Sequence, residues 1–482
     1  MPILPVVLWT DLLLFALIGV AIAAAFYVRG QPHLLAGWRG VAAGGAAMSA
    51  LTVLTAFVAV GVLDSIHYRA VLDGNRGGEH RYAVEVTSLF DLMVSGLRAR
   101  TEKTYSAPLS AQLFSRESVE RADGTQSREF PRLRHGGAHL KDPQSEAGAD
   151  FAGRVLRGSA LALVLWLALG GFLAAALARR HGVTASEVWR DIWRGDTSVA
   201  WRAMLVSAGL LLAVACPVSM LAEAWHVFGT DKVGQDVLYQ TLKSIRTALV
   251  IGTLTTLVTL PIAVGLGILA GYFGGWVDDV IQYIYTTLNS IPGVLLIAAS
   301  VLMMQVVIDT HPDWFATSAE RADARLLALC LILGVTSWTG LCRLLRGETL
   351  KLRELDYVLA ARAFGVSQAR IMARHILPNL MHIVLISVVM DFSGLVLAEA
   401  VLSYVGVGVD PSTISFGTMI NSARMELSRE PMVWWSLLAA FVFMFLLVLS
   451  ANLFADAVRD AFDPRLQSLV RPRRAPRLAG AT

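Results

Sequence analysis

The chain is poor in charge and in cysteine for its length, and both shortages exclude classes of protein. Only 16% of its 482 residues are charged, whereas 55% are hydrophobic. A soluble protein of this size would lack the polar surface that it needs. The three cysteines, Cys216, Cys330 and Cys342, lie in or beside apolar runs and match no metal-ligand spacing. We therefore expect neither a disulfide framework nor a metal site.

Lysine is scarce as well, and no lysine follows glycine in a Gly-x-x-x-x-Gly-Lys-Ser/Thr pattern. The sequence therefore contains no loop of the kind that cradles nucleotide phosphates. It also lacks a nucleophile elbow and a His-Glu-x-x-His pair. We expect the chain not to be an enzyme and to hold no cofactor. The net charge of +4 lies mostly in short loops and the tail, so we expect no nucleic-acid partner.

Apolar runs of about 20 residues recur along the whole chain, which is typical of an all-α polytopic membrane protein. The runs predict nine spans, at residues 5–28, 40–63, 158–178, 203–222, 245–272, 281–308, 325–343, 381–405 and 433–455. The first run has no basic segment before it, so we interpret it as an uncleaved span. Arginines in the short loops and the tail place the C-terminus in the cytoplasm and the N-terminus in the periplasm.

A hydrophilic stretch between the seventh and eighth spans has the pattern of a helix, a turn and a second helix. Residues 352–364 are good helix formers, and Gly365 allows the left-handed geometry that ends a helix. Ser367 is placed to cap a second helix from Gln368 to about residue 376. We expect Pro378 to stop that helix before the next span.

This stretch resembles the coupling motif of ATP-binding-cassette (ABC) transporter permeases, in the binding-protein-dependent dipeptide, oligopeptide and nickel import branch. The matching positions are Ala360, Ala361, Gly365, Leu377 and Pro378. Two positions depart from the motif: Leu359 stands where the family has Glu, and His375 stands where it has Ile. The resemblance implies that these matching residues, with Arg370, form the contact with an ATPase.

The resemblance further implies a type I importer permease (the C-type inner-membrane subunit) in the bacterial inner membrane that moves peptides by alternating access. Its partners would be a second permease, in a heterodimer, two ATPase subunits that bind ATP and Mg, and a periplasmic solute-binding protein. Around the six-span permease part, 203–465 with its coupling loop 344–379, we expect additional segments. These are two extra spans in 1–63, a periplasmic insert at 64–156, a third extra span at 157–180, an amphipathic elbow helix at 181–202 and a basic tail at 466–482.

Within the insert, the apolar spacing over residues 82–98 predicts a helix. Asp123-Gly124, between two short apolar runs, predicts a β-hairpin. In the elbow segment, Thr184 and Glu187 form a capping-box pattern. At the outer end of the fifth span, we expect Lys243 and Arg246 to reach the lipid headgroups.

Two further groups of residues are candidates for function. The turn after the fourth span resembles the family's Gly-Thr-Asp and Gly-Arg-Asp-Val elements, and the resemblance implies contact with the binding protein or the pore entrance through Gly229, Thr230, Asp231, Gly234 and Asp236. Asp391 lies near the middle of a predicted span, where a carboxylate is costly unless it faces water or a partner. Asp391, and Glu399 in a family-like element, are our candidates for the transport pathway. The alternative for Asp391 is a structural role, in which it is paired or protonated against a neighbouring helix.

Three alternatives remain at this stage. The cargo could be nickel or another small solute. The chain could be an ion-coupled secondary transporter, although no convincing internal repeat supports this. It could also be a sensor or scaffold, although its loops and tail are too short for a cytoplasmic output domain.

Overall fold

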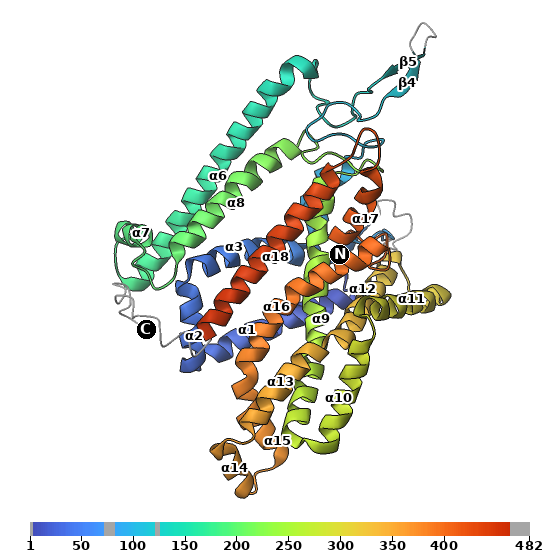
Figure 1. Ribbon diagram of the computed structural model, residues 1–482. Helices are drawn as coiled ribbons and strands as arrows, with labels where there is room; N and C mark the ends of the chain where they lie inside the picture. The colour runs from blue at the N-terminus through green and yellow to red at the C-terminus, as the bar shows by residue number, and fades with distance from the viewer. Residues whose placement is uncertain (1–2, 72–81, 121–125, 463–482) are drawn as a thin grey trace, which may run out of the picture.

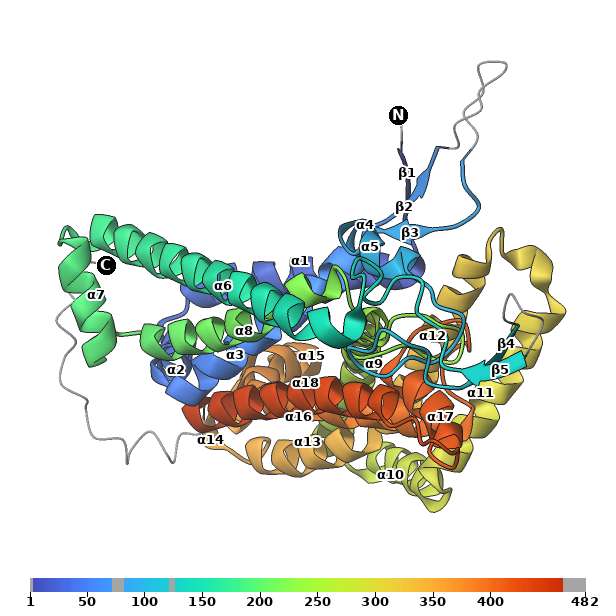
Figure 2. The same ribbon diagram turned by 90° about the horizontal axis from the view of Figure 1, so that it is seen from above.

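The structure is a computed structural model that describes residues 3–71, 82–120 and 126–462, and its helices form one tilted bundle (Figures 1 and 2). Nine helical segments in this part are long and apolar enough to cross a membrane, as predicted. They are α1 (Trp9–Arg29), α3 (Gly45–Asp64), α6 (Pro143–His181), α8 (Trp201–Ala222), α9 (Val237–Phe273), α11 (Gly293–Thr310), α12 with α13 (Ser318–Ser337 and Thr339–Leu352), α15 to α16 (Gln368–Val405) and α18 (Trp435–Phe462).

The prediction of one continuous span at 281–308 is wrong. The segment is divided into α10 (Gly275–Ser290) and α11, and α11 turns away from α10 (Figure 1). The break falls at Ile291, which has an extended backbone, and Pro292. A residue before proline is pushed out of the α region, and proline has no N–H to continue the helical ladder. α10 packs on α9, whereas α11 packs on α12.

The two ends of the bundle carry different short elements. At one end, β1 (Ile3–Val6), β2 (His67–Ala70) and β3 (Thr87–Ser88) form an antiparallel sheet (Figure 2). The helix α17 (Phe416–Glu426) lies on the opposite side of the bundle from this sheet in Figure 2. At the other end lie α2 (Pro32–Ala43), α7 (Ala185–Arg194) and α14 (Asp356–Ala363). The ring of Trp38 in α2 lies 5.6 Å from that of Phe462, the last described residue. We call these the strand end and the elbow end.

The insert contains less helix than its sequence predicts. Residues 82–98 form β3 and two short helices, α4 (Leu89–Met93) and α5 (Ser95–Ala99), because Ser88 and Asp91 make a capping box that starts a helix only at Leu89. The predicted hairpin is present as β4 (Glu117–Glu120) and β5 (Gln126–Glu129), although its turn lies outside the described residues.

We call residues 1–180 the extension, and its three candidate membrane-spanning helices, α1, α3 and α6, pack directly on the six-span part. α3 contacts α8, α9 and α18, α6 lies along α8, and α1 contacts α9 and α12. Small residues allow these approaches. A Cβ at Gly158 in α6 would lie 2.5 Å from the Cα of Pro217 in α8, whereas a Cβ at Gly171 in the same helix would meet nothing within 4 Å.

This contrast gives a matched pair of variants. Gly158→Ala should destabilise the solubilised protein by about 1–3 kcal/mol, because its methyl group forces α6 away from the backbone of α8. Gly171→Ala should be neutral or stabilising by up to about 1 kcal/mol, because alanine is the better helix former. Thermal unfolding in detergent measures both, and equal stability of the two variants would contradict the close packing of α6 on α8.

Candidate functional site

The stretch between α13 and α16 forms an elbow that projects from one end of the bundle (Figure 1). α13 ends at Leu352, α14 covers Asp356–Ala363, and Gly365 turns the chain with φ +73°. Such a φ favours glycine, because a side chain clashes with the backbone there. Apolar side chains fix the elbow to the helices of the bundle. Val358, Ile371 and Ile376 are almost completely buried in a cluster with residues of α9, α10 and α13.

Two details of the predicted elbow are wrong. The Ser367 side chain makes no capping hydrogen bond to α15 (Gln368–Ile371). Pro378 does not end a separate helix either: after α15 the chain widens into a π-helical turn, Met372–Ile376, and continues directly into α16 (Leu377–Val405). A π-turn shifts the hydrogen-bond ladder, so the missing N–H of Pro378 at the second position of α16 costs little. The elbow is thereby joined to α16 as one helical rod.

The outer surface of the elbow has no partner within the described chain. Phe364 at its tip is 87% exposed, and Leu355 and Leu359 are exposed as well. Among the predicted contact residues, Ala360, Gly365, Arg370 and Pro378 are exposed, whereas Ala361 and Leu377 are half-buried. A cleft of about 300 Å³ lies between the elbow and the end of α9, lined by Tyr272, Phe273, Arg353, Glu354, Val358, Leu359, Arg362 and Gln368. An exposed aromatic tip beside a cleft is suited to contact another protein.

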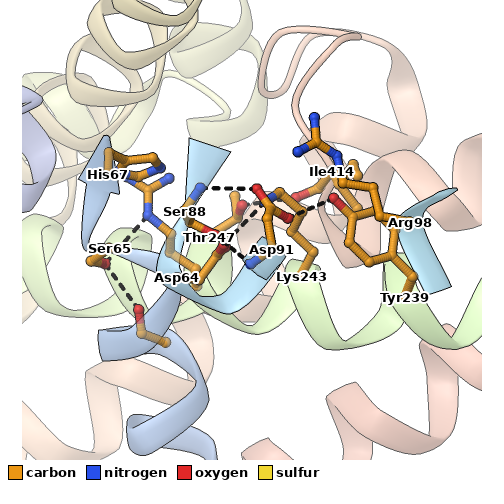
Figure 3. Close-up of polar contacts among 12 residues, drawn as sticks. Asp64, Ser65, His67, Ser88, Asp91, Arg98, Tyr239, Lys243, Thr247 and Ile414 are labelled. Atoms are coloured by element: carbon orange, nitrogen blue, oxygen red, sulfur yellow. Dashed lines mark hydrogen bonds and ion pairs between the residues drawn. The ribbon is translucent and has the colours of Figure 1, made fainter. Parts of the chain in front are cut away.

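Far from the elbow, the two cations of α9 do not reach lipid headgroups as expected but pair with carboxylates of the extension. The Lys243 ammonium lies 2.8 Å from Asp91 Oδ1 in α4 and 3.0 Å from Asp64 Oδ1 at the end of α3 (Figure 3). Asp91 also accepts a hydrogen bond from the Tyr239 hydroxyl at 2.8 Å. Burial alone would raise the pKa of Asp91, but the Lys243 ammonium and these donors hold it at about 2.

Arg246, one turn further along α9, is held in the same way. Its Nη2 donates to Asp11 Oδ1 in α1 at 2.6 Å, and Asp11 Oδ2 lies 2.7 Å from His67 Nδ1 in β2. We call the contacts of Lys243 and Arg246 with Asp11, Asp64 and Asp91 the seam. The acidic side chains of the seam all come from the extension and its basic side chains from α9, so the two parts are complementary in charge.

The turn predicted to receive the binding protein is covered by the chain's own insert. Gly229, Thr230, Gly234 and Asp236 are buried, and Asp231 is half-buried. The Thr230 hydroxyl donates to the Thr104 carbonyl at 2.8 Å, and a Cβ at Gly234 would collide with the backbone of Glu102. In this conformation the insert occupies the surface of the four buried residues.

A buried histidine fastens this insert. The ring nitrogens of His226 lie 2.7 Å from Asp236 Oδ2 and 3.3 Å from Glu102 Oε1. Glu102 accepts three backbone N–H bonds besides, from Arg134, His135 and Gly136. Burial would lower the pKa of His226, but the two carboxylates raise it to about 9. Burial would raise the pKa of Glu102, but His226 and the backbone donors lower it to about 2. We call this group the latch.

The two pathway candidates lie in different surroundings. Glu399 is 1% exposed and accepts hydrogen bonds from the hydroxyls of Ser403 and Ser415, at 2.6 and 2.9 Å. It therefore helps to fix the start of α17, because Ser415 caps that helix. Asp391 lies on the exposed side of α16, and no hydrogen bond or ion pair joins it to another residue in the part of the chain that the structure describes.

The seam predicts a large effect for one lysine. Lys243→Met should destabilise the protein by about 3 kcal/mol, because it leaves Asp64 and Asp91 as buried charges without a counterion. The double variant Lys243→Met/Asp91→Asn should recover part of this loss. Lys232→Met, at an exposed position, is the matched control and should change stability by less than about 0.5 kcal/mol. If thermal unfolding gives equal values for the two single variants, Lys243 does not hold the extension.

The latch predicts how attachment of the insert depends on pH. Because the pKa of His226 rises from 6.5 to about 9 on folding, its stabilisation is complete below pH 6.5 and is lost as pH rises through about 9. Because the pKa of Glu102 falls from 4.5 to about 2 on folding, the stabilisation that Glu102 contributes is complete above pH 4.5 and is lost as pH falls through about 2. Limited proteolysis of the insert should therefore accelerate above pH 8. A His226→Gln variant should lose this alkaline step, and an unchanged step in the variant would exclude the latch.

Comparison with known proteins agrees with this geometry. Residues 263–468 match the family described as binding-protein-dependent transport system inner membrane component. The oligopeptide transport system permease protein of Mycobacterium tuberculosis is 34% identical over 246 residues, which are 51% of this chain and 78% of that protein. The dipeptide transport system permease protein of Bacillus subtilis is 29% identical, over 51% of this chain and 70% of that protein. The glutathione transport system permease protein of Pectobacterium atrosepticum is 29% identical, over 58% of this chain and 92% of that protein.

The relatives therefore cover about half of this chain. The matched family segment contains α10 to α18, including the elbow and the helix that it joins. The chain belongs to the family of binding-protein-dependent transport system inner membrane components, as a multi-pass permease subunit with an N-terminal extension.

Proposed function

We propose that this permease moves peptides into the cell, driven by separate ATPase subunits that bind the elbow. The observation that carries the proposal is the exposed tip at Phe364, which lies at the turn just before a helical rod that runs from Gln368 without interruption into α16. A push on the tip would reach the middle of the bundle through that rod. Such a movement is a two-state change biased from a remote site.

Peptides are the proposed cargo because of the relatives. The names of the three proteins above specify oligopeptides, dipeptides and glutathione, all of which contain peptide bonds. No comparable observation favours nickel or an ion-coupled mechanism.

The proposed orientation places the elbow end in the cytoplasm and the strand end in the periplasm. β1 at the start of the chain pairs with β2, beside the insert, so the N-terminal strand and the insert share one end. α7 and the elbow share the other, and their arginines favour the cytoplasmic side. The tail 466–482 lies outside the described residues.

The proposed assembly contains this chain, a second permease in a heterodimer, two ATPase subunits that hold ATP and Mg, and a solute-binding protein. The insert covers the turn at 229–236, so we propose that the binding protein contacts the insert instead. Phe130 beside β5 is exposed, and the Arg116 guanidinium lies over its ring at 5.1 Å. The hairpin of β4 and β5 extends beyond the strand end in Figure 1 and is the proposed contact.

The elbow is tested by a series at Gly365. Gly365→Val should abolish peptide uptake, because a β-branched residue is strained at φ +73°. Gly365→Asn is the matched control and should retain most uptake, since asparagine tolerates left-handed backbone and nothing lies within 4 Å of the added Cβ. Uptake of radiolabelled peptide by cells with equal amounts of inserted protein is the measurement. Normal uptake by Gly365→Val would refute the elbow as the coupling element.

We also propose that Asp391 meets the amino group of a peptide in transit. Asp391→Asn should reduce uptake of peptides with a free N-terminus at least tenfold while changing uptake of N-acetylated peptides less than twofold. The reason is that only the free terminus carries the charge that a carboxylate attracts. Equal losses for both peptides would instead assign Asp391 a structural role.

A further inference from the structure

The corner where α6, α7 and α8 meet is built from an amphipathic helix that is fixed in place. α7 lies across the ends of α6 and α8 (Figures 1 and 2), and a Thr184–Glu187 capping box starts it, as predicted. Val188 and Ile192 are completely buried and pack with Ala174 and Leu205. The apolar face of α7 is therefore used within the protein, and its polar face points outward.

Three tryptophans join the helices at this corner. The ring of Trp166 in α6 lies 6.4 Å from those of both Trp189 and Trp193 in α7, which are 5.9 Å apart. The Trp166 indole donates to the Leu205 carbonyl in α8 at 2.8 Å. Trp193 is partly exposed. Clustered indoles with one exposed edge are typical of the boundary between membrane and water.

The corner also carries exposed arginines, and only Arg190 among them interacts electrostatically with a carboxylate of the described chain, that of Glu187. Arg179 and Arg180 end α6, Arg190 and Arg194 lie one turn apart on α7, and Arg202 lies in α8. All five are exposed, and none forms an ion pair within the described residues. Arg202 Nη1 lies 3.4 Å from the Trp193 carbonyl, which places its guanidinium at the end of α7, beside Arg194.

The acidic residues of this segment do not balance the arginines. Between residues 179 and 202 there are five arginines against Glu187, Asp191 and Asp196. The Glu187 carboxylate is used within the capping box, where it accepts bonds from the Thr184 N–H and hydroxyl. Exposed guanidinium groups beside indoles are suited to bind phosphate, because the guanidinium fork matches phosphate oxygens.

We propose that this corner binds the phosphate groups of anionic phospholipids, with Arg190, Arg194 and Arg202 as the principal contacts. The occupant is a lipid because the tryptophans put the arginines at headgroup depth, where an anionic membrane surface attracts basic side chains. The site joins α6 of the extension to the first helix of the permease part, and it does not depend on the cargo.

The test measures lipid binding by the purified full-length chain. Native mass spectrometry with phosphatidylglycerol, and separately with phosphatidylcholine, gives the affinity for each lipid. The wild type should prefer phosphatidylglycerol, and the triple variant Arg190→Gln/Arg194→Gln/Arg202→Gln should bind it at least fivefold more weakly. Arg362→Gln/Arg370→Gln/Arg374→Gln, which removes three exposed or partly exposed arginines from the elbow region, is matched in charge and should change binding less than twofold.

Each other outcome overturns the proposal. Equal losses in the two triple variants would mean that only net charge matters. Displacement of phosphatidylglycerol by millimolar inorganic phosphate would indicate a site for free anions. Replacement of the same three arginines by lysine keeps the positive charge but removes the guanidinium fork. It should therefore restore only part of the affinity for phosphatidylglycerol that the glutamine variant loses. A folded lysine variant that binds phosphatidylglycerol as tightly as the wild type would mean that positive charge alone holds the lipid, and would exclude the guanidinium–phosphate contact.

Discussion

The pairing of the α9 cations with carboxylates of the extension is the constraint on which the strand end of the molecule depends. Lys243 and Arg246 lie on a helix whose neighbours are largely apolar, and a charge left alone there would be costly. The carboxylates that compensate them arrive from three separate elements, α1, α3 and α4. The extension is therefore more than an appendage to the permease part, because it supplies the counterions of Lys243 and Arg246.

This arrangement separates the roles of the two ends. At the strand end, the seam and the latch join the extension to α9 and to the turn before it, and most polar groups there are paired within the chain. At the elbow end, Phe364 at the tip of the elbow is exposed. The buried residues Val358, Ile371 and Ile376 attach only the part of the elbow that lies against α9, α10 and α13. Helices that are fixed at the strand end and exposed at the elbow end suit a subunit on which a partner protein acts at the elbow end.

Local patterns in the sequence predicted the parts of the fold that depend on neighbouring residues. The nine spans follow from apolar runs, the β4–β5 hairpin from Asp123-Gly124, and the start of α7 from Thr184 and Glu187. The turn of the elbow follows from Gly365, whose φ is positive. The break at Pro292 could not be identified in this way, because Pro217 and Pro261 also lie in apolar runs and yet sit inside the continuous helices α8 and α9.

Contacts between distant residues could not be predicted in this way. Asp91 and Lys243 are 152 positions apart, Asp11 and Arg246 235, and Glu102 and His226 124. Asp11 and Asp64, at the ends of the first two spans that lie toward the strand end, were the one available signal that Lys243 and Arg246 pair with protein groups and not with lipid. The burial of the turn at 229–236 had no signal, because it depends on how a distant insert folds.

The most direct test of the account is to place a photo-crosslinking amino acid at Phe364 in the complete transporter. Phe364 is the most exposed large hydrophobic side chain of the elbow, so the account predicts a crosslink from this position to an ATPase subunit. The same amino acid at Phe130, at the opposite end, should give no crosslink to that subunit. An ATPase that purifies with the permease yet crosslinks at neither position, or only at Phe130, would contradict the elbow as the site of coupling.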